Sequence, residues 1–319
     1  MKRLIPMLPE PAPQRQAMTA GVRSENRSLE LFAANIRNRH TRRAYMRGAQ
    51  DFLDWRERAG VASIAEVTAL HVASYIEQWG RGRSAPTVKQ RLAAIRRLFD
   101  SLVASQILPA NPASSVRGPP HKMSRSKTRP LDPAMARALL DGIDASEPAG
   151  LRDRALIGLM VYAFARIGAA LAMKVEDVSE RDGRLWVRLR GKGRRRHETP
   201  CHHNLEAYLR AYIEKCGLGA DPAAPLFPTI GRGTDSLTKT PLKQANAYVM
   251  VRRRAAAAGI EARVGNHTFR ATGIAAYLES GGKLETAAAM ANHSSLRTTQ
   301  LYRGRRNAVS ADEVERIPV

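Results

Sequence analysis

A proline-rich, basic stretch interrupts the chain near its middle and limits how it can fold. Residues 116–130 read VRGPPHKMSRSKTRP. Proline cannot continue the interior of a helix or donate to a sheet ladder, so regular structure is expected to stop on either side. The sequence therefore predicts a basic, extended linker over residues 116–130. We expect it to join a helical domain over residues 25–115 to a second domain over residues 131–319, after a disordered leader over residues 1–24.

The first of these domains has the apolar spacing of helices. Val88, Leu92, Ile95, Phe99 and Leu102 repeat at steps of four and three, which places them on one stripe of a helix that begins near Ser84. Further helices are predicted over residues 41–59 and around residues 72–79. Basic residues off these stripes and in the linker are candidates for contact with DNA: Arg42, Arg43, Lys89, Arg96, Arg97, Lys122, Arg125 and Lys127. Taken one at a time, each is also explained by a solvated helix face.

The charge of the chain indicates a polyanionic partner. Lysine and arginine number 52 against 29 acidic residues, which gives a formal net charge of +23. The excess is present both before and after residue 130. An excess of this size is typical of proteins that bind nucleic acid, and its spread predicts that both halves of the chain contact phosphate. The expected partner is double-stranded DNA.

Cysteine content and hydropathy narrow the cellular setting. Only Cys201 and Cys216 are present, which is typical of a reducing cytoplasm. The longest apolar run, residues 155–165, is shorter than the roughly 20 residues that a membrane-spanning helix needs. Prolines interrupt residues 1–16 before a signal peptide could form. A cytoplasmic protein without a membrane span is expected.

The second domain combines helices with one hairpin. An apolar helix, DRALIGLMVYAFA, is predicted to end at Arg166. The segments RLWVRLR and RRHETP flank Gly191, Lys192 and Gly193, and this arrangement indicates a β-hairpin with the lysine in or beside its turn. Amphipathic or alanine-rich segments follow, each closed by glycine or asparagine. The predicted fold class is mainly α with a small antiparallel β-sheet, an α+β arrangement.

Six residues with useful chemistry occur in this second domain. They are Arg166, Lys192, His267, Arg270, His293 and Tyr302. His267 and Arg270 stand three apart at the start of a predicted helix, so both project from one face. The segments FARIGAALAMKVEDV, RGKGRRRHETP, HTFRATGIAAYL and ANHSSLRTTQLY resemble, in order and spacing, the catalytic domain of the tyrosine recombinases, the lambda-integrase-like members of the phage integrase family. The likeness covers about residues 130–310, and the helical first domain resembles the SAM-like core-binding domain that precedes it in this family.

The resemblance implies a site-specific recombinase or integrase that cuts and rejoins DNA strands. Arg166 and Arg270 then clamp the phosphate, because guanidinium groups bind its oxygens bidentately, and His293 donates a further hydrogen bond. Tyr302 is the nucleophile, which leaves a 3′-phosphotyrosyl bond and a free 5′-hydroxyl. His267 accepts or relays the phenolic proton, and Lys192 protonates the leaving oxygen.

The same resemblance implies the setting of the reaction. Since the bond energy is kept in the phosphotyrosyl linkage, neither metal nor ATP is required. The family suggests a dimer or tetramer assembled on DNA, in the nucleoid of a bacterium, serving a mobile element or the chromosome.

The sequence departs from the family pattern at three positions. Ala169 stands where an acidic residue is common, Ala271 where a second histidine is common, and Asn292 where glycine is frequent. None of these changes removes a reacting group. They affect the groups that would orient the reacting residues.

Other interpretations remain open. A topoisomerase-like enzyme of type IB uses similar residues on one strand, and an inactive DNA-binding accessory protein would keep the fold. Each of the six residues taken alone has a structural explanation, such as a space-filling tyrosine or a helix-capping histidine. A zinc site would draw on His197, Cys201, His202 and His203, but no second cluster completes a tetrahedral set. The spacing of Val309, Val314 and Ile317 predicts a terminal helix that packs either on its own domain or on a neighbouring protomer.

Overall fold

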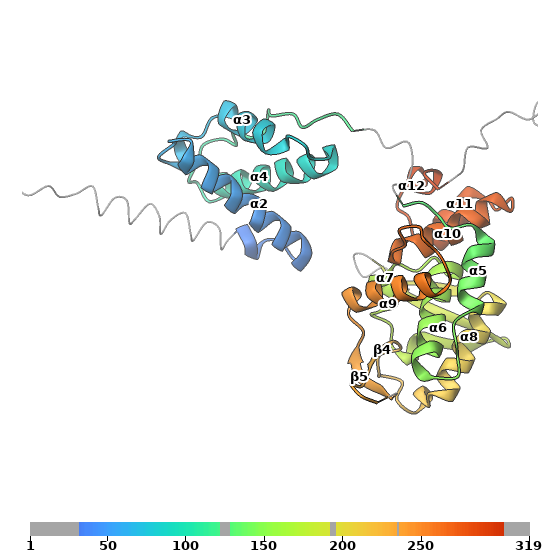
Figure 1. The fold of residues 1–319 in the computed structure, drawn as a ribbon. Helices are drawn as coiled ribbons and strands as arrows, with labels where there is room; N and C mark the ends of the chain where they lie inside the picture. The colour runs from blue at the N-terminus through green and yellow to red at the C-terminus, as the bar shows by residue number, and fades with distance from the viewer. Residues whose placement is uncertain (1–31, 122–127, 192–195, 235, 303–319) are drawn as a thin grey trace, which may run out of the picture. The chain divides into compact units, whose positions relative to one another are not determined.

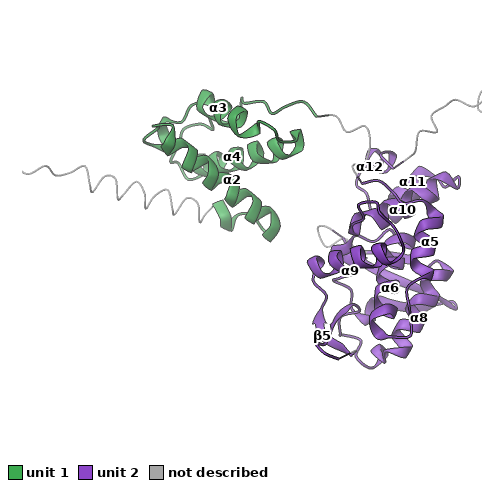
Figure 2. Cartoon of the chain, viewed as in Figure 1, with its two compact units in different colours: residues 1–122 green, residues 123–319 purple. Residues whose placement is uncertain are grey.

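The computed structural model describes residues 32–121, 128–191, 196–234 and 236–302 (Figure 1). The chain divides into two units, residues 1–122 and residues 123–319, each with its own hydrophobic core (Figure 2). The predicted leader, residues 1–24, and the hydrophobic positions expected after residue 308 lie outside the described residues.

The first unit is built from helices α2 (Arg39–Arg58), α3 (Ala69–Gly80) and α4 (Ala85–Ala104), with a short 3-10 turn at Ile64–Glu66. The predicted stripe on α4 is buried at all five positions. Phe52 packs edge-on against Tyr75 and Phe99, with ring centroids 5.2 and 5.8 Å away, so aromatic rings from all three helices meet in one core. The three helices expected from the sequence are therefore confirmed.

The second unit is centred on helix α6 (Pro148–Tyr162), which is buried along most of its length and packs against α8 (His203–Lys215) and α10 (Asn266–Glu279). The other helices are α5 (Pro133–Asp141), α7 (Ile167–Ala170), α9 (Gln244–Ala257), α11 (Leu284–Met290) and α12 (Leu296–Gln300). Short 3-10 turns occur at Val175–Asp177 and Leu218–Ala220. Helices α10, α11 and α12 lie at the same end of this unit (Figure 1).

A three-stranded antiparallel sheet carries the predicted hairpin. Strand β2 (Arg184–Arg190) lies between β1 (Val178–Arg181) and β3 (Arg196–Pro200), with Leu189 opposite His197. The pairing of β2 with β3 confirms the hairpin, while the turn that contains Lys192 lies outside the described residues. A second, two-stranded sheet pairs β4 (Pro228–Ile230) with β5 (Leu237–Pro241) and was not expected. The fold class is thus confirmed as mainly α with a small antiparallel sheet.

Helix α6 ends four residues before the predicted position. Its last residue is Tyr162, and Phe164 has a φ of 48°, in the left-handed region that no helix continues through. Gly273 of α10 lies against this turn so closely that a Cβ there would come within 1.9 Å of the Val161 carbonyl oxygen. The close approach of α10 fixes where the chain must leave α6, and sequence periodicity does not report such a contact.

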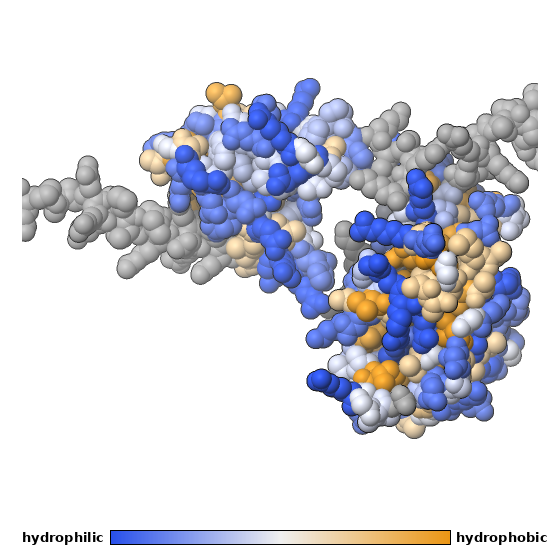
Figure 3. Space-filling view, viewed as in Figure 1, coloured by the Kyte–Doolittle hydropathy of each residue, from blue (hydrophilic) through white to orange (hydrophobic). Residues whose placement is uncertain are grey.

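Hydrophilic side chains cover most of the visible surface of both units, with apolar atoms exposed in patches on the second (Figure 3). In the part of the chain that the structure describes, no helix is both long and apolar enough to span a lipid bilayer.

Candidate active site

Arg166 lies between α6 and α7, and its guanidinium reaches the segment that follows α11. Its Nη1 donates to the main-chain oxygens of Ala291 and Asn292, and its Nη2 donates to the Asn292 oxygen, all at 3.3 Å. Asn292 has a φ of 46°, a left-handed conformation that turns the chain after α11. Arg166 is thereby joined to Ala291, 125 positions later in the chain, by a hydrogen bond to an uncharged main-chain oxygen.

Arg270, on the first turns of α10, is only 3% exposed. It donates through Nη1 to the oxygen of Phe164 and through Nη2 to the oxygen of Ala291, the latter at 2.6 Å. Burial, and then the charge of Arg166, lower the pKa of Arg270 to about 10. Two guanidinium groups are therefore close enough to repel each other.

His293 completes this group of cations and hydrogen-bonding side chains. Its Nε2 lies 2.8 Å from Nη2 of Arg270, and its Nδ1 lies 2.8 Å from Oγ1 of Thr299. Burial, followed by the charges of Arg270 and Arg166, lowers the pKa of His293 to about 4. The imidazole is therefore neutral near pH 7 in the protein alone.

Tyr302 follows α12 and lies next to His293. Their rings are nearly parallel, with centroids 6.1 Å apart and an interplanar angle of 9°. The Tyr302 amide donates to the Thr299 oxygen at 3.0 Å. Its ring packs with Phe164, Ile274 and Ala291 in a small separate core. The Tyr302 phenol also acts to raise the pKa of Arg270. The sequence-predicted nucleophile thus lies beside the predicted phosphate ligands.

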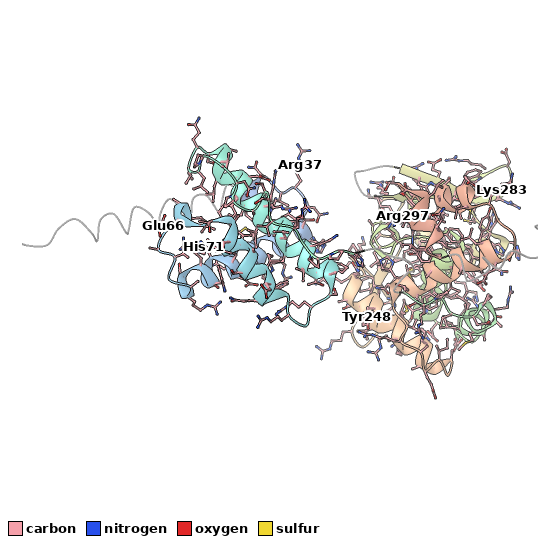
Figure 4. The ribbon with its side chains drawn as sticks, turned by 90° about the horizontal axis from the view of Figure 1, so that it is seen from above. Arg37, Glu66, His71, Tyr248, Lys283 and Arg297 are labelled. Atoms are coloured by element: carbon pink, nitrogen blue, oxygen red, sulfur yellow. The ribbon has the colours of Figure 1, made fainter. Side chains whose placement is uncertain are left out.

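His267 lies one turn before Arg270 on α10 and its side chain is exposed. Partial desolvation lowers its pKa, as do the charges of Arg270 and Arg166. A hollow beside it is lined by Arg129 and Arg263, and by Tyr248 of α9, which is labelled in Figure 4. A histidine kept neutral in this position can accept a proton.

The charge of this site is unbalanced. Neither Arg166 nor Arg270 forms an ion pair with a carboxylate among the residues that the structure describes, and their hydrogen-bond partners are main-chain oxygens and an imidazole. The side chain of Ala169, close to Arg166 in the sequence, supplies no such group. Positive charge held by neutral acceptors is suited to binding an anion.

Several predicted residues cannot be placed in this site. Lys192 lies outside the described residues, as do three of the candidate DNA contacts, Lys122, Arg125 and Lys127. On α2 and α4, the side chains of Arg43, Lys89 and Arg97 are exposed.

Two other arginines of the first unit bind main-chain oxygens. Arg42 is exposed and donates to the Ile36 oxygen at 2.8 Å. Arg96 is half-buried and donates to the oxygens of Ala113, at 3.1 Å, and of Val116. Arg96 therefore holds residues 113–116 against α4, whatever else it contacts.

The residues considered for zinc have other surroundings. Cys201 is buried in the core of the second unit, and the ring of His202 stacks on Tyr162 with centroids 4.5 Å apart. No group of three or more potential ligand side chains that could hold a metal ion occurs within the described ranges. His197 instead lies near Met290 and Arg270. Burial lowers its pKa, a hydrogen bond with the Met290 main chain acts to raise it, and the charge of Arg270 lowers it further.

Two residues at the site were missed by sequence reasoning. Phe164 supplies the oxygen that accepts from Arg270, and Thr299 is fully buried between His293 and Tyr302. For Thr299 a weak signal existed, since it stands three residues before Tyr302 and six after His293. Nothing in the sequence around Phe164 signals its left-handed turn.

Known proteins resemble both parts of the chain. Residues 129–308 match the phage integrase family, and residues 29–106 match the N-terminal SAM-like domain of phage integrases. A similar relative, the tyrosine recombinase XerD of Xanthomonas axonopodis pv. citri, is 30% identical over 274 residues, which cover 83% of this chain and 86% of the relative.

Solved structures of recombinases share the fold. The XerH site-specific recombinase bound to its difH substrate in a pre-cleavage complex aligns with a TM-score of 0.64 at 20% identity, over 86% of this chain and 79% of that one. A lambda integrase dimer bound to a COC′ core site aligns with a TM-score of 0.64 at 18% identity, over 90% and 96% of the two chains. With its SAM-like and catalytic domains in the same order, this chain belongs to the phage integrase family of tyrosine recombinases.

Proposed function

We propose that this protein is a site-specific recombinase that cleaves and rejoins double-stranded DNA through a 3′-phosphotyrosyl intermediate on Tyr302. The observation that carries the proposal is the convergence of Arg166, Arg270 and His293 beside the Tyr302 ring, with no carboxylate among the described residues to neutralise them. The structures of XerH and lambda integrase, which share the fold, were solved on DNA.

In this mechanism the two arginines bind the non-bridging oxygens of one phosphodiester. The Tyr302 oxygen attacks phosphorus, a tyrosyl O–P bond forms, and the bond from phosphorus to the 5′ oxygen breaks. The phenolic proton passes to His267, whose pKa is lowered by partial desolvation and then by the charges of Arg270 and Arg166, so that the ring is neutral and can accept it. Lys192 supplies the proton that the departing 5′ oxygen needs. A 5′-hydroxyl from another strand then reverses the step.

The phosphotyrosyl bond retains the energy of the broken phosphodiester, so the exchange requires neither ATP nor a metal ion. Arg43, Lys89 and Arg97 are exposed on the first unit and supply phosphate contacts there. Assembly as a dimer or tetramer on DNA follows from the need to exchange strands between two sites, and the lambda integrase relative was captured as a dimer. The proposed setting is the nucleoid in the cytoplasm of a bacterium; the XerD relative is bacterial.

The test is incubation of the purified protein with nicked candidate DNA sites in EDTA, followed by a denaturing gel. A covalent protein–DNA adduct is expected from the wild type and none from Tyr302→Phe. Tyr277→Phe is the matched control, since Tyr277 packs in the same small core; it should form adduct.

Two results would overturn the proposal. An adduct that persists in Tyr302→Phe would exclude Tyr302 as the nucleophile. Relaxation of supercoiled DNA by single protomers, without preference for any sequence, would instead assign the same chemistry to a topoisomerase of type IB.

A further inference from the structure

The His293 imidazole is bound at both nitrogens, and the two partners differ in kind. Nε2 faces the Arg270 guanidinium at 2.8 Å, and Nδ1 faces the Thr299 hydroxyl at 2.8 Å. A guanidinium has hydrogen-bond donors and no acceptor. Nε2 must therefore accept from Arg270, which means that it carries no proton in this arrangement.

The proton of the neutral ring then lies on Nδ1. From there it can be donated only to the group that Nδ1 faces, and the Thr299 hydroxyl has lone pairs to accept it. Which nitrogen of a histidine is protonated is set by the hydrogen bond that the other nitrogen makes. Thr299 is suited to this role because it is fully buried, so water does not compete for its hydroxyl.

Thr299 is also bonded to the chain at Tyr302. Its main-chain oxygen accepts from the Tyr302 amide at 3.0 Å. One residue therefore contacts the imidazole through its side chain and the nucleophile through its main chain. The neighbouring Thr298 is exposed on the same helix and contacts neither catalytic residue through any bond that the structure describes.

We propose that Thr299 is a positioning residue, which holds the His293 proton on Nδ1 and so directs Nε2 toward the phosphate bound by the arginines. When a phosphodiester arrives, its negative charge favours a second proton on the ring. Nε2 takes this proton from solvent, gives up the hydrogen bond that it accepted from Arg270, and donates to a phosphate oxygen, while Nδ1 keeps the same bond to Thr299. The hydroxyl serves both protonation states because it accepts in each. The part of this inference that concerns the bound phosphate rests on the proposed function. The part that concerns the His293 tautomer does not.

The tautomer is tested first, by NMR of the full-length protein labelled with ¹⁵N-histidine at pH 7 without DNA. Two-bond correlations within each ring distinguish the nitrogen that carries the proton, and His293→Gln identifies the signal among the eight histidines. The expected result is a proton on Nδ1 of His293. A proton on Nε2 would overturn the proposal, whether or not the protein cleaves DNA.

The consequence for cleavage is tested with two substitutions at one position. Thr299→Val keeps the shape and removes the acceptor, so the rate of adduct formation should fall about tenfold and the tautomer signal should change. Thr299→Ser restores a hydroxyl and should return the rate to within about threefold of the wild type. Thr298→Val is the control and should behave as the wild type does.

The outcomes separate this inference from the proposed function. If no protein, wild type included, forms an adduct, the proposed function fails, while the NMR result still decides the tautomer. If the wild type forms an adduct and Thr299→Val does so at the same rate, the positioning role is excluded. Equal slowing in Thr299→Ser and Thr299→Val excludes it too. If Thr299→Val does not fold, the wild-type tautomer and the cleavage rate of Thr299→Ser decide whether Thr299 is a positioning residue.

Discussion

The main-chain oxygen of Asn292 lies 3.3 Å from each of the two terminal nitrogens of Arg166. It is placed there by a left-handed turn at residue 292, whose φ is 46°. Glycine adopts this conformation freely, asparagine adopts it more readily than other residues with a Cβ, and β-branched residues are strained in it. The departure from the family pattern at this position therefore preserves the backbone that the arginine needs.

This turn predicts the effect of substitutions at residue 292. Asn292→Gly should keep adduct formation within about threefold of the wild type, because glycine accepts the same φ. Asn292→Val should lose about 1–2 kcal/mol of unfolding free energy and slow cleavage about tenfold, as the Arg166 acceptor moves. Thermal unfolding and single-turnover cleavage measure the two effects. Equal behaviour of the two variants would contradict this account of the turn.

The two arginines are expected to respond differently to replacement by lysine. Lysine cannot present two terminal nitrogens in one plane, so either change should slow adduct formation by about 10²–10³. Arg270→Lys should also lower stability, because the buried oxygens of Phe164 and Ala291 lose their donor. Arg166→Lys should lower it less, since that side chain is only half-buried.

Both rates are measured with nicked DNA sites, and both stabilities by chemical denaturation. Arg297→Lys is the control, because Arg297 is exposed on α12 (Figure 4). If Arg166→Lys is as unstable as Arg270→Lys, burial does not determine how much stability each substitution costs.

The histidines of the site predict a loss of stability in acid. The pKa of His293 is lowered to about 4, and desolvation also lowers the pKa values of His267 and His197. Histidine in the unfolded chain titrates near 6.5. Between about pH 6.5 and pH 4 the unfolded chain binds more protons than the folded protein, so stability falls as the pH falls through this window.

Thermal unfolding of His293→Gln should therefore depend less on pH than that of the wild type. The difference between pH 7 and pH 5 is expected to be about 1 kcal/mol, because solvent reaches part of the ring. His121→Gln, which removes an exposed histidine, is the control and should keep the wild-type dependence. An unchanged slope in His293→Gln would show that this ring is not the group that titrates.

Two adjacent arginines on α4 should separate stability from DNA binding. Arg96 donates to the oxygens of Ala113 and Val116, so Arg96→Ala should lower the unfolding free energy by about 1–2 kcal/mol. Arg97 is exposed, so Arg97→Ala should leave stability nearly unchanged and weaken DNA binding. It should also reduce the dependence of log affinity on log salt by about one unit.

Denaturation curves and DNA affinities at several salt concentrations test this pair. If Arg97→Ala binds DNA as the wild type does at every salt concentration, α4 does not contact phosphate through this side chain. A stable Arg96→Ala variant would show that residues 113–116 are held by other contacts.

Periodicity and alternation predicted most of the fold, since they report which side of an element is buried. The stripe from Val88 to Leu102 and the alternation in RLWVRLR both describe faces that the structure buries. One available signal was overlooked. Asp182 and Gly183, with φ values of 50° and 73°, form the turn between β1 and β2, and this dipeptide is a strong signal for a tight hairpin.

The remaining features depend on contacts between distant segments. The left-handed turn at Phe164 is imposed where α10 packs against the end of α6, 106 residues away from the Arg270 that uses its oxygen. Arg96 was expected to face DNA because its position on α4 is polar, yet residues 113–116 fold back onto it. Spacing along the chain shows which residues share a face of a helix, and it does not show what covers that face.

The oxygens that hold Arg166 and Arg270 belong to the main chain, and this affects how the protein can evolve. Side chains around the pocket can drift without removing an acceptor, because every residue carries a carbonyl. Positions 164, 291 and 292 are constrained by the path of the backbone more than by the identity of their side chains. Divergent descendants of this sequence could therefore retain both guanidinium groups in place while little else near them stays recognisable.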